Sequence, residues 1–123
     1  MSLDSSESIA MQEAQREVCR RFGATFLQPR DDDKLGVALH TLSVLPLNGL
    51  RHPTTEGTSG WYVWGGGEPG DDPEFFAPLH IAHLPDACPD AQPYLGLPPG
   101  WRFLVAPDVE DVWFDASLLT VSG

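Results

Sequence analysis

Positive charge is scarce in this chain. Its 123 residues include seven Lys and Arg against 18 Asp and Glu, which gives a net charge of −11. Beyond residue 34 the only Lys or Arg residues are Arg51 and Arg102. Because such a surface repels nucleic-acid phosphate and anionic lipid, we expect neither nucleic acid nor membrane as a partner. The charge would speed association with a basic protein, although an acidic solvated surface, common in soluble proteins, explains it equally well.

Cysteines are few, and long apolar runs are missing. Cys19 and Cys88 lie far apart without a CxxC pattern, so we expect two buried free thiols in a reducing compartment. The N-terminus shows no basic segment followed by an apolar one, and no run approaches the roughly 20 residues that span a bilayer. These features predict a cytoplasmic protein.

The length and composition favour one domain. With 41% apolar residues, 123 residues are enough to bury a core without disulfides or metal. We place the domain at residues 1–123 and expect residues 1–8 to be flexible. The 12 prolines and 12 glycines indicate short elements joined by many turns.

Apolar spacing predicts the elements. Apolar residues three and four apart place a helix up to Phe22, which Gly23 ends. Strands are expected over residues 24–27, 34–42, 60–64, 79–82, 101–106 and 109–114, the last two as a hairpin. Prolines between His83 and Leu95 predict short helical turns there. The predicted fold class is α+β: a mostly antiparallel sheet of five to six short strands, with an N-terminal helix and a short proline-interrupted helix packed on it.

The most apolar strand is expected at the centre of the sheet. Gly60-Trp61-Tyr62-Val63-Trp64 is apolar on both faces, which is typical of a strand covered on both sides. Residues 46–60 before it are interpreted as a loop long enough to be functional. Gly36 begins the face of strand 34–42 that carries small residues, and we expect the first helix to pack there.

Catalytic and metal-binding patterns are weak. His80 and His83 form an HxxH pair five residues before Cys88; in a strand the two imidazoles point to opposite faces, whereas in a helix they could share an ion. Because no second ligand pair accompanies them, we predict no metal and no cofactor. Three glycines at 65–67 lack a following Lys-Ser/Thr and precede four acids, which argues against nucleotide binding. Ser59 does not lie in a Gly-x-Ser-x-Gly elbow, so no enzyme is predicted.

Three segments resemble a known family. They are NGLRHP at 48–53, SGWYVW at 59–64 followed by DDPEFF at 71–76, and PYLGLPPGWRFL at 93–104 followed by VWFD at 112–115. Together, over roughly residues 13–119, they are similar to the bacterial immunity-protein domain family numbered thirty-three in polymorphic toxin systems, in its "-like" branch. The better-known branch has Gly-Trp-Arg-Phe in its aromatic strand. Here that strand is Gly60-Trp61-Tyr62-Val63, and Gly100-Trp101-Arg102-Phe103 stands in the later hairpin.

The resemblance implies a cytoplasmic, non-enzymatic protein that binds and neutralises a cognate bacterial toxin. The family has no established catalytic residues to carry over. An acidic surface would suit a basic toxin, and we expect a monomer or a weak homodimer. We expect toxin contact on segment 48–59 and on the acidic turn 68–74, with Trp64 as an exposed aromatic anchor. The predicted contact residues are Arg51, His52, Glu56, Trp64, Glu68, Asp71, Asp72 and Glu74.

Three alternatives stay open. In the first, Arg51 only bonds loop carbonyls and its role is structural. The protein could instead be a small metal-dependent hydrolase that uses His80 and His83. It could also be an interaction or chaperone module of a secretion system.

Overall fold

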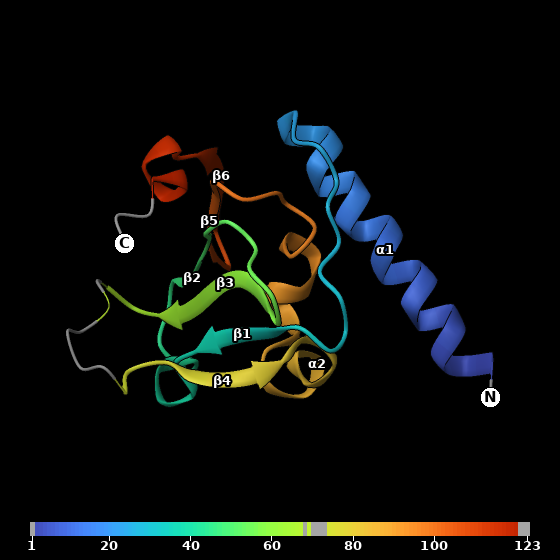
Figure 1. The fold of residues 1–123 in the computed structure, drawn as a ribbon, viewed down its shortest axis with the longest axis horizontal. Coiled ribbons are helices and arrows are strands. Elements are labelled where there is room, and N and C mark those ends of the chain that lie inside the picture. The colour runs from blue at the N-terminus through green and yellow to red at the C-terminus, as the bar shows by residue number, and fades with distance from the viewer. Residues whose placement is uncertain (1, 68, 70–73, 121–123) are drawn as a thin grey trace.

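The computed structural model describes residues 2–67, 69 and 74–120, with side chains described from residue 9 onward. Figure 1 shows the arrangement of the chain. In order, the helices and strands are α1 (Ser2–Phe22), β1 (Lys34–Val37), η1 (Leu39–Thr41), β2 (Leu47–Arg51), β3 (Thr58–Gly65), β4 (Ala77–His80), η2 (Ile81–His83), α2 (Leu84–Ala87), η3 (Pro89–Tyr94), β5 (Trp101–Ala106), β6 (Val109–Phe114) and η4 (Ala116–Leu119), where η denotes a 3-10 helix. The predicted α+β class is confirmed.

The six strands form one sheet in the order β4-β1-β3-β2-β5-β6. Only the β1–β3 pair is parallel, and the other four pairs are antiparallel. The predicted aromatic strand is β3, which pairs with β1 on one side and β2 on the other. Its inner position is therefore confirmed, although one of its side chains, Tyr62, remains exposed.

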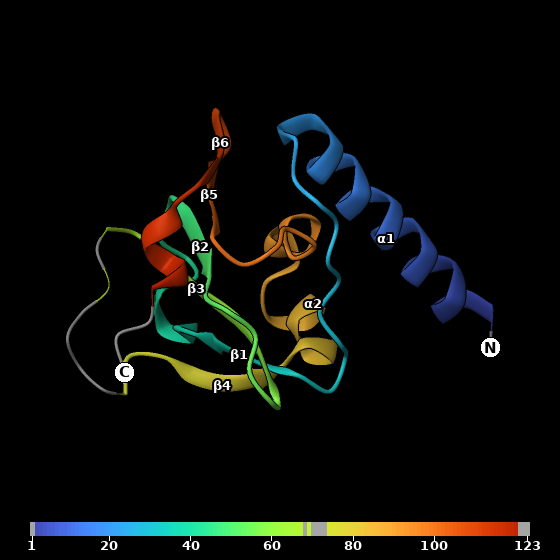
Figure 2. The ribbon, with the colours of Figure 1, turned by 45° about the horizontal axis from the view of Figure 1, so that its top comes forward.

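Helical segments cover one face of the sheet in two layers. The short helices η2, α2 and η3 lie between the strands and α1, as the two ribbon views show (Figures 1 and 2). Gln15 of α1 donates a 2.9 Å hydrogen bond to the carbonyl of Gln92 in η3, and Cys19 Sγ lies 3.4 Å from the carbonyl oxygen of Gly96. α1 is thus anchored to the segment around η3.

The expectation that the first helix packs on the Gly36 face is therefore wrong. A Cβ at Gly36 would lie 2.6 Å from the ring of Tyr62 and 3.3 Å from Phe76. Aromatic side chains from β3 and from the segment before β4 fill the space that the absent side chain leaves. A glycine in a strand indicates that another part of the protein approaches closely, but it does not identify that part.

The core lies between the sheet and the helical layer. Its fully buried side chains come from both layers and include Trp61, Phe103, Leu84, Leu95, Leu97, Val37 and Val63. The indole of Trp61 donates a 3.0 Å hydrogen bond to the carbonyl of Leu95, so its single polar atom is satisfied inside the core. Burial of each such large apolar side chain contributes about 1.5–3 kcal/mol relative to exposure.

Several predicted elements are confirmed. α1 ends at Phe22, and Gly23 follows with a φ of 77°, as expected of a glycine that ends a helix. The hairpin is formed by β5 and β6 with the predicted bounds, and the proline-rich segment folds as the short helices α2 and η3. Cys19 and Cys88 are buried and free, as predicted. Burial raises the pKa of both thiols.

Other elements differ from the prediction. Residues 24–27 form no strand; this segment is held by a hydrogen bond from Leu27 N to the carbonyl of Gly96. The predicted strand 34–42 ends at Val37 and continues as η1, and β4 lies at 77–80 instead of 79–82. The predicted loop 46–60 contains β2. Its buried face consists of Leu47, Gly49 and Arg51, and a glycine and a cation conceal the apolar alternation that marks a strand.

Candidate functional site

The sheet face opposite α1, η2, α2 and η3 is the candidate site. Strand register aligns one residue from every strand in a row that crosses this face. We call it the cross-strand row, and from edge to edge it consists of Pro78, Gly36, Tyr62, Leu50, Arg102 and Trp113. Tyr62 and Trp113 are 37% and 38% exposed. The row therefore presents two accessible aromatic side chains on an otherwise regular sheet surface.

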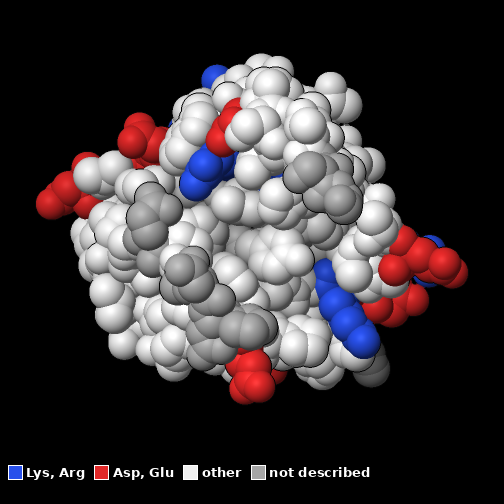
Figure 3. Space-filling view, turned by 60° about the vertical axis from the view of Figure 1, so that its left-hand side comes forward, with Lys and Arg blue, Asp and Glu red and all other residues white. Residues whose placement is uncertain are grey.

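A groove of about 880 Å³ lies at the β4–β1–β3 end of this face. Among the described residues, no acidic side chain lines it, and its surface is mostly apolar. Figure 3 looks at the side of the molecule away from α1 and shows a hollow of uncharged side chains near its centre. The side chains that shape the groove include His52, Tyr62, Phe76, Pro78 and Leu119. Concave, mostly apolar surfaces of this size are typical of binding sites.

Aromatic rings build one side of the groove. The Tyr62 ring meets Phe76 edge to face, with centroids 5.1 Å apart, and meets His52 in the same way at 5.6 Å. Phe76 also lies against Trp64, whose indole donates a 2.7 Å hydrogen bond to the carbonyl of Gly67. Because these rings hold one another, the groove wall is formed before any partner binds.

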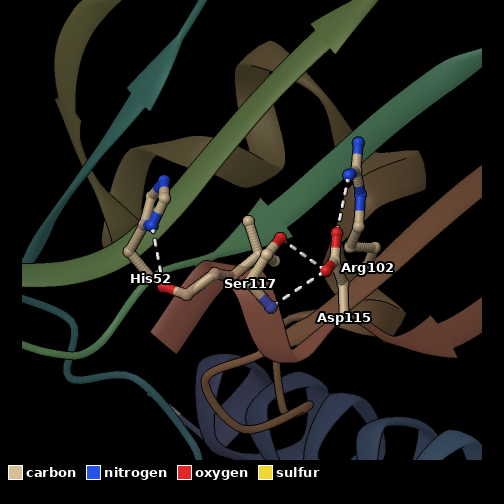
Figure 4. Close-up of polar contacts among 5 residues, drawn as sticks. His52, Arg102, Asp115 and Ser117 are labelled. Atoms are coloured by element: carbon tan, nitrogen blue, oxygen red, sulfur yellow. Dashed lines mark hydrogen bonds and ion pairs between the residues drawn. The ribbon is translucent and has the colours of Figure 1, made fainter. Parts of the chain in front are cut away.

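The opposite side of the groove is formed by η4, which hydrogen bonds fix in place (Figure 4). Asp115 accepts hydrogen bonds from the Ser117 hydroxyl at 2.6 Å and the Ser117 amide at 3.1 Å, and Arg102 Nη1 lies 3.1 Å away. The bonds from Ser117 and Arg102 lower the pKa of Asp115. His52 Nδ1 lies 3.2 Å from the carbonyl oxygen of Leu118. Since a carbonyl can only accept, Nδ1 carries the proton in this contact.

Two of the predicted contact residues lie inside the fold. Arg51 is 1% exposed, and it donates hydrogen bonds to the carbonyls of Ser59 at 2.9 Å and of Leu27 and Leu97 at 2.8 Å. Burial lowers the pKa of Arg51 to about 10. The structure therefore supports the interpretation that Arg51 bonds carbonyls. Trp64 is 3% exposed, so the expectation that it is an exposed aromatic anchor is wrong.

The other predicted contact residues divide into two groups. His52 lines the groove, Glu56 is exposed at the turn between β2 and β3, and Glu74 is exposed just before the aromatic residues Phe75 and Phe76. Glu68, Asp71 and Asp72 lie outside the described residues. The structure thus places His52 together with Thr55 and Thr58, on either side of Glu56, at one site.

The HxxH pair does not gather a metal-binding set. His80 ends β4 and His83 ends η2, with ring centroids 6.1 Å apart, while Cys88 is buried in the core. In the part of the chain that the structure describes, no group of three or more His, Cys, Asp or Glu side chains could hold a metal ion.

The sequence reasoning did not single out the cross-strand row or Lys34, which also lines the groove. Alternation within the predicted strands assigns Tyr62, Lys34 and Gly36 each to one face of its own strand. It could not align those faces with Leu50, because β2 was interpreted as a loop. The register that creates the row depends on β2.

Comparisons with known proteins identify the family of the chain. A family model described as the Imm33-like domain matches residues 14–115, a range that contains all six strands. No curated protein and no solved structure gives a significant match. Within the described residues, no helix has both the length and the apolar character needed to cross a membrane. The predicted resemblance is confirmed, and the chain belongs to the Imm33-like family of immunity-protein domains.

Proposed function

We propose that this protein is a non-enzymatic immunity protein that binds and neutralises a cognate bacterial toxin in the cytoplasm. Membership of the Imm33-like family, over residues 14–115, is the observation that carries the proposal. Neutralisation then requires a stoichiometric complex, because a protein that blocks another by binding has no turnover. We propose that the protein binds as a monomer or a weak homodimer.

The open face of the sheet is the surface we assign to the toxin. It offers a preformed apolar groove together with exposed aromatic side chains at Tyr62 and Trp113. Aromatic residues are enriched among the few contacts that dominate protein–protein binding energy. The rest of a docked surface would then exclude water around these anchors.

Acidic and polar residues of the predicted contact segments are proposed as further contacts. They are His52, Glu56 and Glu74, together with the acids of the turn outside the described residues, Glu68, Asp71 and Asp72. The net charge of −11 would draw a basic toxin toward the protein over distances of about a Debye length. This contribution should weaken as salt concentration rises.

Calorimetric titration tests the proposal. The protein is titrated with the C-terminal domain of the protein encoded beside its gene, at low and at high salt, and the toxic activity of that domain is measured in parallel. We expect one-to-one binding, loss of the toxic activity, and weaker affinity at high salt. A toxin domain from an unrelated system serves as the control partner.

The outcomes separate the candidate functions. Absence of binding at both salt concentrations would contradict the immunity proposal. Binding to a component of the delivery machinery, with no binding to the toxin domain, would instead support the interaction-module function.

Substitution of an exposed aromatic residue tests the assigned face. Trp113→Ala should weaken toxin binding by about tenfold or more, as truncation of an aromatic side chain that dominates an interface does. Ile9→Ala is the matched control, because Ile9 is an exposed apolar side chain on α1, beyond the helical layer. Equal affinities of the two variants would place the toxin on another surface.

A further inference from the structure

Lys34 is the one basic side chain, among the residues that the structure describes, whose charge has no partner. Four arginines form ion pairs with carboxylates: Arg20 with Glu17, Arg21 with Glu110, Arg30 with Asp32 and Arg102 with Asp115. The guanidinium of Arg16 lies over the ring of Phe26, and Arg51 bonds main-chain carbonyls. A free cation is unexpected in a chain with 18 carboxylate residues.

Lys34 lines the groove on the sheet face opposite α1. Lys34 is the first residue of β1, and its register partner on β4 is His80. Among the described residues, the groove lining contains no acid, and His52 is the only other residue there that can become a cation. The sign of the groove is therefore opposite to that of the whole protein.

Most of the remaining lining of the groove is apolar. Tyr62, Phe76 and Pro78 lie on the sheet side, and Leu119 projects from η4 with 43% exposure. Such walls exclude water from a bound segment, and an ion pair is stronger where water is excluded than on an open surface. An apolar segment with one anionic group matches both properties of the groove.

We propose that the groove receives an apolar segment of the toxin that carries a carboxylate, and that this carboxylate pairs with Lys34. The assignment rests on the proposed immunity function. A basic segment would bring like charge toward Lys34 and is disfavoured. The net charge of −11 and the groove then act on different features of the toxin. The net charge attracts a basic domain, and the groove binds one segment of that domain that carries an acid.

Charge reversal at Lys34 is the first arm of the test. Lys34→Glu should weaken binding of the toxin domain by about tenfold or more, because a carboxylate would then face a carboxylate. Arg20→Glu changes the net charge equally on the exposed side of α1, and we expect it to alter affinity by less than about threefold. Equal effects of the two variants would overturn the assignment to the groove.

A second pair of variants probes the apolar wall. Leu119→Asp places an acid in the groove, and we expect it to weaken toxin binding by about tenfold. Leu39→Asp is matched to it: Leu39 is also an exposed leucine in a 3-10 helix, with 51% exposure, and it does not line the groove. Because both side chains are exposed, both variants should fold, which circular dichroism checks. Affinities that fall equally would count against the groove.

The outcomes keep this inference separate from the proposed function. If the wild-type protein does not bind the toxin domain, the immunity proposal fails, and the assignment of a toxin segment to the groove fails with it. If the wild type binds and the groove variants bind equally well, only the groove assignment fails. Decanoate serves as a small amphiphilic probe. If it perturbs the amide resonances of Gly36 and Tyr62 without competing with the toxin domain, the groove serves a small molecule and the assignment is overturned.

Discussion

The guanidinium carbon of Arg51 lies 5.7 Å from the centroid of the Trp61 ring, and both side chains are buried in the core. The two residues are register partners on β2 and β3. Arg51 also donates to the carbonyls of Leu27, before β1, and Leu97, after η3. One cation therefore connects the sheet to two segments that are distant in sequence.

Arg51→Met should lower the free energy of unfolding by about 3 kcal/mol, because three carbonyls lose their donor, two in buried hydrogen bonds and one in a partly buried hydrogen bond. Urea denaturation measures the loss. The pKa of about 10 keeps Arg51 protonated across the neutral range, so the loss should be the same at about pH 6 and about pH 8. Arg30→Met removes an exposed arginine and should change stability by less than about 0.5 kcal/mol. Equal stability of the two variants would contradict a structural role for Arg51.

Gly60 and Gly57 differ in why glycine is required: Gly57 for its backbone conformation alone, and Gly60 also because another atom lies close to it. Both have positive φ, 90° and 81°, but a Cβ at Gly60 would lie 2.1 Å from the carbonyl oxygen of His52, whereas a Cβ at Gly57 would meet nothing within 4 Å. Gly57→Ala should cost about 1 kcal/mol for its backbone conformation. Gly60→Ala should cost about 1–3 kcal/mol more, because the backbone must shift. Thermal unfolding of both variants measures the difference, and equal costs would show that β3 adjusts without strain.

Glu110 links α1 and η3 to the edge strand β6. It accepts hydrogen bonds from Arg21 at 2.9 and 3.1 Å and from the Tyr94 hydroxyl at 2.6 Å, and the bonds from Arg21 and Tyr94 lower its pKa below the ordinary 4.5. A depressed carboxylate pKa stabilises the fold above the ordinary value, and this stability is lost as the pH falls through the folded-state pKa.

Glu110→Gln should therefore cost about 1 kcal/mol at neutral pH, since the groups are partly exposed and solvent screens them. The difference from wild type should shrink as the pH falls below 4.5. Denaturant unfolding at several pH values measures it. Asp108→Asn, in the turn between β5 and β6, is the control and should leave the free energy of unfolding unchanged. A difference that persists undiminished in acid would show that charge is not the cause.

Asp115 is expected to hold η4, and with it one wall of the groove. Asp115→Ala removes the acceptor of two hydrogen bonds from Ser117 and one from Arg102. The amides of η4 should then exchange faster with solvent, which hydrogen–deuterium exchange measures. Asp111→Ala on β6 is the control and should leave η4 unchanged. Unaltered exchange in Asp115→Ala would show that the contact between His52 and Leu118 suffices.

Local sequence patterns were enough to predict the elements whose formation depends mainly on neighbouring residues. Helix α1 follows from apolar spacing and from Gly23, and the β5–β6 hairpin follows from two β-prone runs around a Pro-Asp turn. β2 was missed because its inward positions hold Gly49 and Arg51. A Cβ at Gly49 would lie 2.1 Å from the Phe103 ring, and Arg51 needs carbonyls from distant segments. Neither requirement is visible within the strand itself.

The candidate site shows the same division. The sequence by itself determined the fold class, the family, the charge of the protein and which neighbouring residues share a strand face. Only the tertiary structure decided that Trp64 is covered, that Tyr62 is exposed and that Lys34 forms no ion pair with another described residue. The physical reason is that alternation assigns side chains to two faces, whereas burial depends on what packs there. Here Phe76 and η4, distant in sequence, determine which part of the face remains open.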